Sequence, residues 1–266
     1  MRYVRVEFEG RLRDARLDEP DLAELQVTLL DAPFLQGGSP VGSSLRLPLS
    51  ALRAPVTPGK IVCVGQNYRK HAAELGKPVP EEPLLFLKAT SSIIGPGDPI
   101  RLPPESERVD HEGELGVVIG TRMVDVPARD ALAHVFGYVG TNDVTARDLQ
   151  RKDVQFTRAK SFDSFCPVGP FVETELDPAD VDIRVTVNDL LRQDGHTGDM
   201  VFPVPVLLAY ISAVMTLEPG DLVLTGTPAG VGPLAQGDVV QVTLRGLGTL
   251  RNPVTTRTRH SGIVGG

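Results

Sequence analysis

The fold of this chain is constrained most by a series of short apolar segments that are separated by turn signals, with few helical patterns between them. Segments such as KIVCVGQNY, PLLFLKAT and GELGVVIG have the length and residue content of strands. Later strand candidates follow Pro-Gly-Asp and Gly-Asp pairs, which favour tight turns. Because these strands do not alternate regularly with helices, the sequence predicts an α+β, β-rich fold rather than a doubly wound parallel sheet.

The length of 266 residues allows one large domain or a catalytic domain with a small companion. The chain opens with the strand-like MRYVRVEFEG, and the loop-like FLQGGSPVGSS follows. We therefore predict a small N-terminal β-rich domain over residues 1–55 and a main domain over residues 56–266. Apolar residues at helical spacing predict a core-packed helix from about Val206 to Leu217, and the final SGIVGG is expected to fray.

Charge and composition argue against several classes of partner. The formal net charge is -7 without a basic tract, which disfavours nucleic acid or an anionic membrane, whereas a small anionic substrate fits if a metal reverses the local field. The N-terminus lacks the apolar core of a secretory signal, and the longest apolar stretch is too short to cross a bilayer. Cys63 and Cys166 lie far apart among apolar residues, so we expect reduced thiols in a cytoplasmic protein.

The segment VDHEGELGVVIG places three acidic residues two apart at the start of an apolar strand. In a strand, Asp110, Glu112 and Glu114 share one face, where their carboxylates repel one another. A solvated strand end is the ordinary explanation. The alternative is a divalent cation such as Mg²⁺, Mn²⁺ or Ca²⁺ held by these hard oxygen ligands, and that hypothesis requires a further acid elsewhere in the chain.

The segment GYVGTNDVTARDLQ offers that acid. Asp143 ends a predicted strand just before a helix that is expected to start near Thr145, although an Asn-Asp pair is also an ordinary turn former or cap. Arg147 and Gln150, three apart on this helix, share a face on which a guanidinium and an amide could grip a substrate carboxylate. The ordinary alternative for Arg147 is a surface position.

The segment GQNYRKHAAELGKP predicts a short helix that Asn67 caps and Gly76 ends. His71 and Glu74, at positions i and i+3, then project to the same side. A carboxylate beside an imidazole orients the ring and raises its basicity, as a base that activates water requires. A surface pair of these two residue types is the common alternative.

Two further segments carry polar residues beside apolar runs. Lys160, in RAKSFDSFCPVGPF, could stabilise an enolate or deliver a proton if it is buried beside a metal, since the pKa of a lysine falls on desolvation; by default it is solvated. Thr225 and Thr227 lie in the glycine-rich LTGTPAGVG, where backbone amides and a hydroxyl could hold an anion. This turn lacks the lysine of a phosphate loop and the spacing of a dinucleotide fingerprint.

In order and combination, these segments resemble the fumarylacetoacetate hydrolase family. The resemblance covers roughly Lys60 to Pro253, and the blocks HEGELGVVIG, NDVTARDLQ and KSFDSFCPVGP are specific for it. The first 55 or so residues resemble the small, variable domain of many bacterial members. The family implies a mixed β-sheet catalytic fold and a homodimer.

The resemblance also implies a role for each candidate residue. Glu112, Glu114 and Asp143 match the ligands of a catalytic Mg²⁺ or Mn²⁺, for which Ca²⁺ can substitute in crystals. His71 and Glu74 match a water-activating dyad on a mobile lid. Lys160 matches a lysine that lies beside the substrate. Three further positions match residues that bind the substrate, namely Arg147, Gln150 and Thr227.

The substrates that the resemblance implies are 2-oxo or 2,4-dioxo acids or their enols. The first hypothesis is C–C bond cleavage through a metal-stabilised enolate, either acylpyruvate hydrolysis or oxaloacetate-type decarboxylation. The alternative is a 2-hydroxyhepta-2,4-diene-1,7-dioate or 5-carboxymethyl-2-hydroxymuconate isomerase-decarboxylase of aromatic degradation. A non-catalytic module with a structural cation is the hypothesis from a different class.

Overall fold

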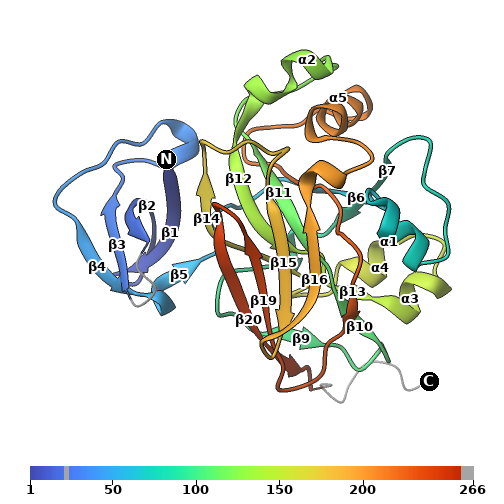
Figure 1. The fold of residues 1–266 in the computed structure, drawn as a ribbon. Coiled ribbons are helices and arrows are strands. Elements are labelled where there is room, and N and C mark those ends of the chain that lie inside the picture. The colour runs from blue at the N-terminus through green and yellow to red at the C-terminus, as the bar shows by residue number, and fades with distance from the viewer. Residues whose placement is uncertain (21–23, 259–266) are drawn as a thin grey trace, which may run out of the picture.

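A long mixed sheet runs through the computed structural model, which describes residues 1–20 and 24–258, and joins an N-terminal lobe to the main lobe (Figure 1). Its strands follow the order β4-β3-β2-β1-β14-β12-β11-β17-β6-β7. The strands of the N-terminal lobe are β1 (Arg2–Phe8), β2 (Arg11–Pro20), β3 (Glu24–Leu29), β4 (Leu45–Pro48) and β5 (Leu52–Arg53). The main lobe contributes β6 (Ile61–Gly65), β7 (Leu84–Lys88), β11 (Gly113–Ile119), β12 (Val135–Asn142), β14 (Cys166–Glu173) and β17 (Leu222–Leu224), and β8 (Ile93–Ile94) pairs with β14.

A smaller five-stranded sheet packs against β11 and β12 and lies in front of them in Figure 1. Its order is β16 (Leu190–His196), β15 (Asp182–Val187), β19 (Val239–Leu244), β20 (Gly248–Thr256) and β9 (Ile100–Leu102). A third, three-stranded sheet joins β13 (Thr145–Ala146), β10 (Val109–His111) and β18 (Gly232–Pro233). The β-rich α+β class predicted from the sequence is confirmed.

Strand β11 is buried on both faces, which explains its almost continuous apolar sequence. Leu115 and Val117 face the core between the two large sheets, whereas Val118 belongs to the core on the opposite side. A Cβ atom on Gly113 would lie 2.4 Å from a methyl group of Val185 in the smaller sheet, so a residue larger than glycine does not fit here. This close approach fixes the strand that carries Glu112 and Glu114.

The N-terminal lobe continues the long sheet through a short contact. Only Arg2 and Tyr3 of β1 pair with β14, and the rest of β1 pairs with β2 and β5. Val4 and Val6 alternate with polar residues and are buried in the lobe. The domain boundary at residue 55 stays a prediction.

Helices cover the edges of the main lobe (Figure 1). The α-helices are α1 (Arg69–Glu74), α2 (Ala128–Ala131), α3 (Arg147–Lys152), α4 (Thr157–Lys160) and α5 (Val204–Val214). Short 3-10 turns are η1 (Phe34–Gln36), η2 (Leu49–Ala51), η3 (Thr90–Ser92), η4 (Leu132–His134) and η5 (Thr197–Asp199). Within the described residues, no helix has the length and apolarity that crossing a membrane requires.

Three expectations about helix ends were wrong. Helix α5 begins at Val204 and stops at Val214, because the chain beyond it turns extended and Leu217 forms a bridge with Met123. Helix α3 starts at Arg147 rather than near Thr145, since Thr145 and Ala146 pair with β10 instead. Asn67 does not cap α1, because Tyr68 occupies the N-cap position. The terminal SGIVGG lies outside the described residues.

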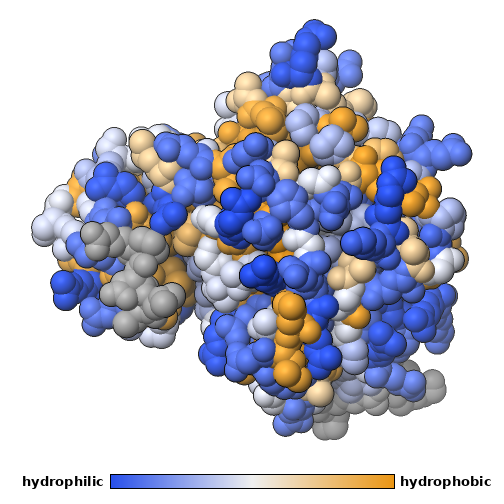
Figure 2. All heavy atoms as spheres, in the orientation of Figure 1, coloured by the Kyte–Doolittle hydropathy of each residue, from blue (hydrophilic) through white to orange (hydrophobic). Residues whose placement is uncertain are grey.

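The surface and the cysteines agree with the composition. Figure 2 shows a mostly hydrophilic face with scattered apolar groups, as is usual for globular proteins.

Cys63 and Cys166 are both buried and free, which confirms the expectation of reduced thiols. They lie in the apolar cluster behind β11, where burial raises the pKa of Cys166 to about 12.

Candidate active site

One cavity in the main lobe, about 410 Å³ with the solvent-open space at its mouth, gathers every predicted site residue except Glu74 along its lining. These residues come from α1, from the β10–β11 junction, from the β12–α3 connection, from α4 and from the turn after β17. The cavity is also lined by residues that the sequence analysis did not single out, among them Gln66, Lys77, Phe86 and Phe156.

The carboxylates of Glu112, Glu114 and Asp143 meet in this cavity. One ligand oxygen of each lies within 4.8 Å of the others, and all three residues are buried. Backbone hydrogen bonds hold them together, because the Asp143 amide donates to the Glu112 carbonyl at 2.8 Å. The Glu112 amide in turn donates to Asn142 Oδ1 at 2.9 Å. The acid that the metal hypothesis required therefore lies beside the first two.

Two cations neutralise part of this cluster. Lys160 Nζ donates to Glu112 Oε2 at 2.8 Å and to Asp143 Oδ2 at 2.5 Å. Arg147 pairs with Glu112 through one nitrogen and donates from Nε to Asp110 Oδ2 at 2.9 Å. Burial by itself raises the pKa of Glu112, but Lys160 and Arg147 outweigh it and hold that pKa far below its usual range.

Glu114 has the opposite balance. Burial and the neighbouring charges of Asp143 and Glu112 raise the pKa of Glu114 well above its usual value. Its one hydrogen bond among the described residues comes from the Gly226 amide, which donates to Oε2 at 2.7 Å. The cluster thus carries more negative charge than Lys160 and Arg147 offset.

The expectation that desolvation lowers the pKa of Lys160 was wrong. Lys160 is 2% exposed, and this burial alone would lower its pKa. Asp143 and Glu112 outweigh the burial and raise the pKa of Lys160 above its ordinary value. In this arrangement Lys160 is an ammonium group that donates hydrogen bonds.

Lys88 and Asp110 complete the charge network. Lys88 was not predicted to have a role, and Asp110, grouped with Glu112 and Glu114 as a possible ligand, pairs with arginines instead. Lys88 Nζ is buried and donates to Asp143 Oδ1 at 2.6 Å. Asp110, predicted on the same face as Glu112, is bound by Arg147 and Arg108 and holds the guanidinium of Arg147 in place. A lysine that ends the apolar strand PLLFLK is the signal that could have indicated Lys88.

His71 and Glu74 form the predicted pair on α1. Glu74 Oε2 lies 3.1 Å from His71 Nδ1, and His71 is 4% exposed. When Nδ1–H donates to Glu74, His71 Nε2 keeps the lone pair that can accept a proton. Glu74 also accepts a hydrogen bond from the Gly230 amide at 3.1 Å, which ties α1 to the loop after β17.

The predicted cap of α1 was wrong. Tyr68 occupies the N-cap position, without a side-chain capping bond. Asn67 instead donates to the carbonyls of Phe202 and Thr225 and accepts from the Phe202 amide, so it joins two loops below the helix. Gly76 follows the helix with φ of 66°, as predicted for its end.

The predicted binding residues lie in the same lining. Gln150 Oε1 accepts from Arg147 at 2.6 Å, which leaves the Gln150 amide hydrogens free to point elsewhere. Thr227 donates its hydroxyl proton to the Gly113 carbonyl at 2.8 Å. The turn around Thr225 holds the Glu114 carboxyl group through the Gly226 amide, so this amide binds a side chain of the protein rather than a ligand.

The three carboxylates fit a hard divalent cation. Their oxygens are the donor type that Mg²⁺ and Mn²⁺ prefer, and they are close enough to share one ion. Burial and the charges of Asp143 and Glu112 raise the pKa of Glu114, and a cation bound beside it would oppose that shift. A buried acidic cluster of this kind can hold a divalent metal.

Comparison with known proteins decides the family. Residues 60–255 match the family model described as fumarylacetoacetate (FAA) hydrolase C-terminal. The chain belongs to the fumarylacetoacetate hydrolase family. The resemblance inferred from the sequence blocks is therefore confirmed, and so is the mixed-sheet fold of this family. Members of the fumarylacetoacetate hydrolase family are enzymes.

Three relatives show how far the similarity extends. Protein Rv2993c of Mycobacterium tuberculosis is 47% identical over 249 residues, which cover 92% of each chain. Oxaloacetate tautomerase FAHD2B, mitochondrial, of Bos taurus is 43% identical over 269 residues, covering 92% of this chain and 84% of that protein. The crystal structure of 5-carboxymethyl-2-hydroxymuconate delta-isomerase from Mycobacterium smegmatis has a TM-score of 0.89 and 43% identity, covering 97% of this chain and 100% of that chain. The similarity includes both lobes.

Proposed function

We propose that this protein is a divalent-metal-dependent enzyme that interconverts the keto and enol forms of a 2-oxo acid. One observation carries the proposal: a proton acceptor, His71, and a buried ammonium donor, Lys160, line the same cavity as the carboxylate cluster. Enolisation requires a base at carbon and stabilisation of the charge that develops on oxygen. Mg²⁺ or Mn²⁺ is the ion that this donor set favours.

Each side chain has a definite part in this proposal. When bound by Glu112, Glu114 and Asp143, the cation supplies a Lewis acid for the substrate's oxygen atoms. His71 Nε2 accepts the proton from C3, and Glu74 stabilises the imidazolium that results. Lys160 donates a hydrogen bond to the oxygen on which negative charge develops, and the proton that His71 took from C3 passes to that oxygen to complete the enol.

The remaining residues bind and orient the substrate carboxylate. Because Gln150 Oε1 accepts from Arg147, the Gln150 amide is oriented with its N–H groups available to a carboxylate. Arg147 is itself held by Asp110, so its position is fixed before a substrate arrives. The names of two relatives, a tautomerase and a delta-isomerase, support this class of reaction.

C–C bond cleavage is the second candidate, and the geometry of the His71–Glu74 pair favours it. The same Nε2 lone pair can take a proton from water, which then attacks the C4 carbonyl of a 2,4-dioxo acid. The bond between C3 and C4 breaks, and Lys160 donates to the enolate that leaves. Decarboxylation of oxaloacetate would pass through an enolate that Lys160 stabilises in the same way.

An assay with two readouts tests the proposal. Oxaloacetate is supplied in its enol form with Mg²⁺, with Mn²⁺ or with chelator, and the enol absorbance and the released pyruvate are followed separately. We expect metal-dependent loss of the enol band without pyruvate, abolished in His71→Ala and retained in Lys152→Ala. Pyruvate at the rate of enol loss would favour cleavage, and no acceleration of either process, with acetylpyruvate also unchanged, would reject both.

The state of the protein in the cell is also part of the proposal. We propose a cytoplasmic homodimer, because the family resemblance implies the assembly and the composition implies the location. Sedimentation at several concentrations measures the assembly, and a monomer at all of them would contradict it.

A further inference from the structure

Lys77 lines the cavity, and no carboxylate among the described residues pairs with it. Three cations line the cavity, and Arg147 and Lys160 are both paired with buried acids. Lys77, by contrast, is exposed and forms no ion pair within residues 1–20 and 24–258. Its charge is therefore available to an anion that enters from solvent.

The end of α1 places Lys77 at the cavity. Gly76 adopts φ of 66°, which reverses the chain after the helix. The Lys77 amide then donates to the Ala72 carbonyl at 2.9 Å, and the Gly76 amide donates to that of Ala73 at 3.0 Å. This turn brings Lys77 to the cavity that His71 of the same helix also lines.

Two aromatic rings connect Lys77 with the buried end of the site. Lys160 Nζ lies 4.9 Å from the centroid of the Phe86 ring, and the Phe86 and Phe156 rings meet edge to face at 5.7 Å. Lys77 Nζ lies 6.0 Å from the centroid of the Phe156 ring. An apolar wall thus separates a buried ammonium at one end from an exposed ammonium at the other.

This arrangement matches a molecule with an anionic group at each end and carbon atoms between them. We propose that Lys77 binds the distal carboxylate of the substrate and so selects 2-oxo diacids over 2-oxo acids with a neutral distal end. The inference rests on the proposed function, since it assumes that the 2-oxo group lies at the Lys160 end. A distal carboxylate without Lys77 would lie against Phe156 with no charged partner.

Substitutions that change only the charge test this role. We compare Lys77→Gln, Lys77→Arg and Lys77→Glu on oxaloacetate and on its 4-ethyl ester, which keeps the reacting atoms and loses the distal charge. Lys77→Gln should raise KM for oxaloacetate about tenfold with little change in kcat, as expected for one partly exposed charge-assisted hydrogen bond. KM for the ester should stay at the wild-type value in Lys77→Gln. Lys77→Arg should keep KM for oxaloacetate close to the wild-type value, and Lys77→Glu should raise it more than Lys77→Gln does.

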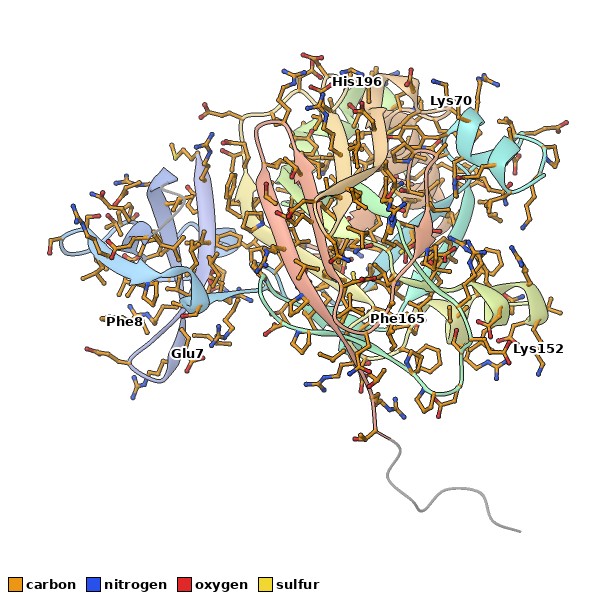
Figure 3. All side chains as sticks on the ribbon, turned by 60° about the horizontal axis from the view of Figure 1, so that its bottom comes forward. Glu7, Phe8, Lys70, Lys152, Phe165 and His196 are labelled. Atoms are coloured by element: carbon orange, nitrogen blue, oxygen red, sulfur yellow. The ribbon has the colours of Figure 1, made fainter. Side chains whose placement is uncertain are left out.

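Lys70→Gln is the matched control, because Lys70 is an exposed lysine of α1, the helix that precedes Lys77, and does not line this cavity (Figure 3). Equal effects of Lys77→Gln on both substrates, or no effect, would overturn the inference.

A binding measurement separates this result from the proposed function. Malate has a distal carboxylate and oxalate has none, and calorimetry with Mg²⁺ present measures both without turnover. Lys77→Gln should weaken the binding of malate and leave the binding of oxalate unchanged, even if the wild-type protein turns over neither oxaloacetate nor its ester. In that case the proposed reaction is wrong and the diacid site stands. A malate affinity that is equal in Lys77→Gln and in wild type would overturn the inference, whatever the activity.

Discussion

The side-chain amide of Gln193 donates to the hydroxyl of Thr227 at 2.7 Å and so joins the smaller sheet to the active-site cavity. Gln193 lies in β16 and is 0% exposed. Its carbonyl oxygen accepts from the Gly113 amide at 3.0 Å and lies 3.0 Å from His111 Nδ1. Gln193 thus positions the Thr227 hydroxyl and the amide of Gly113, the residue between Glu112 and Glu114.

Replacing Gln193 should therefore damage both stability and the site. Gln193→Met leaves the buried Gly113 amide and His111 Nδ1 without this partner and removes the hydrogen bond that the Thr227 hydroxyl accepts, so we expect about 2 to 4 kcal/mol less free energy of unfolding. We also expect weaker divalent-cation binding, because the strand that carries Glu112 and Glu114 loses its support. Denaturant unfolding and calorimetric metal titration measure the two effects.

The control for this substitution is Gln241→Met, which changes an outer glutamine of the same sheet that bonds Asp189 at 2.9 Å. It should leave both quantities almost unchanged. Metal affinity that is equal in Gln193→Met and wild type would show that the network supports only folding.

Sequence patterns located the site where its geometry is local. Glu112 and Glu114 are two apart at the start of β11, in a segment that the sequence predicts as a strand, and His71 and Glu74 are three apart in a helix. Periodicity alone therefore predicts that each pair shares a side. The position of Asp143 could be predicted in the same way, because the sequence indicates where the strand before it ends.

The missed features depend on contacts between distant segments. The role of Lys88 follows from how β7 lies beside Asp143, and that of Gln193 follows from how the smaller sheet stacks on β11. The direction of the Lys160 pKa shift depends on two carboxylates that no local pattern places beside it. Helical periodicity likewise failed at Leu217, where pairing with Met123 replaced the helix.

Glu114→Gln should weaken Mg²⁺ binding without lowering the stability of the metal-free protein. Burial and the charges of Asp143 and Glu112 oppose a charged Glu114, so the neutral amide should unfold at the same temperature as wild type or higher when chelator is present. With Mg²⁺ at about 100 times Kd, wild type should gain about 5 °C or more, and the variant should gain little. Thermal unfolding with and without Mg²⁺ measures this difference.

Glu218→Gln serves as a control for charge alone, because Glu218 forms an exposed pair with Arg122. It should keep the full Mg²⁺ response. An equal response in Glu114→Gln would remove Glu114 from the set of ligands.

His71 and Glu74 should differ in the size of their effect on catalysis. His71→Ala removes the proton acceptor and should lower kcat about 10²- to 10⁴-fold, whereas Glu74→Gln keeps the imidazole and should cost less. Steady-state assays with the enol of oxaloacetate measure both. His196→Ala should be neutral, since His196 pairs with Asp180 and does not line the cavity (Figure 3). Full activity in His71→Ala would remove the base from the proposed reaction.

Glu173 should make the joint between the two lobes sensitive to acid. Partial burial by itself raises the pKa of Glu173, but hydrogen bonds from the Glu175 amide, the N-terminal ammonium and Arg2 lower it below its usual value. A carboxyl whose pKa is lowered on folding contributes stability at neutral pH, and this contribution is lost as the pH falls through the folded-state pKa. The loss should be at most about 1 kcal/mol, because solvent screens the pairs at this sheet edge.

Glu173→Gln should therefore be less stable than wild type at neutral pH, and this difference should disappear as the pH falls through the folded-state pKa and the wild-type carboxyl becomes protonated. Denaturant unfolding across this pH range measures the difference. Glu175→Gln is the control, since the Glu175 side chain is exposed and lies 3.5 Å from the same terminal ammonium. A difference between Glu173→Gln and wild type that stays constant with pH would mean that Glu173 joins the lobes through packing, not through its charge.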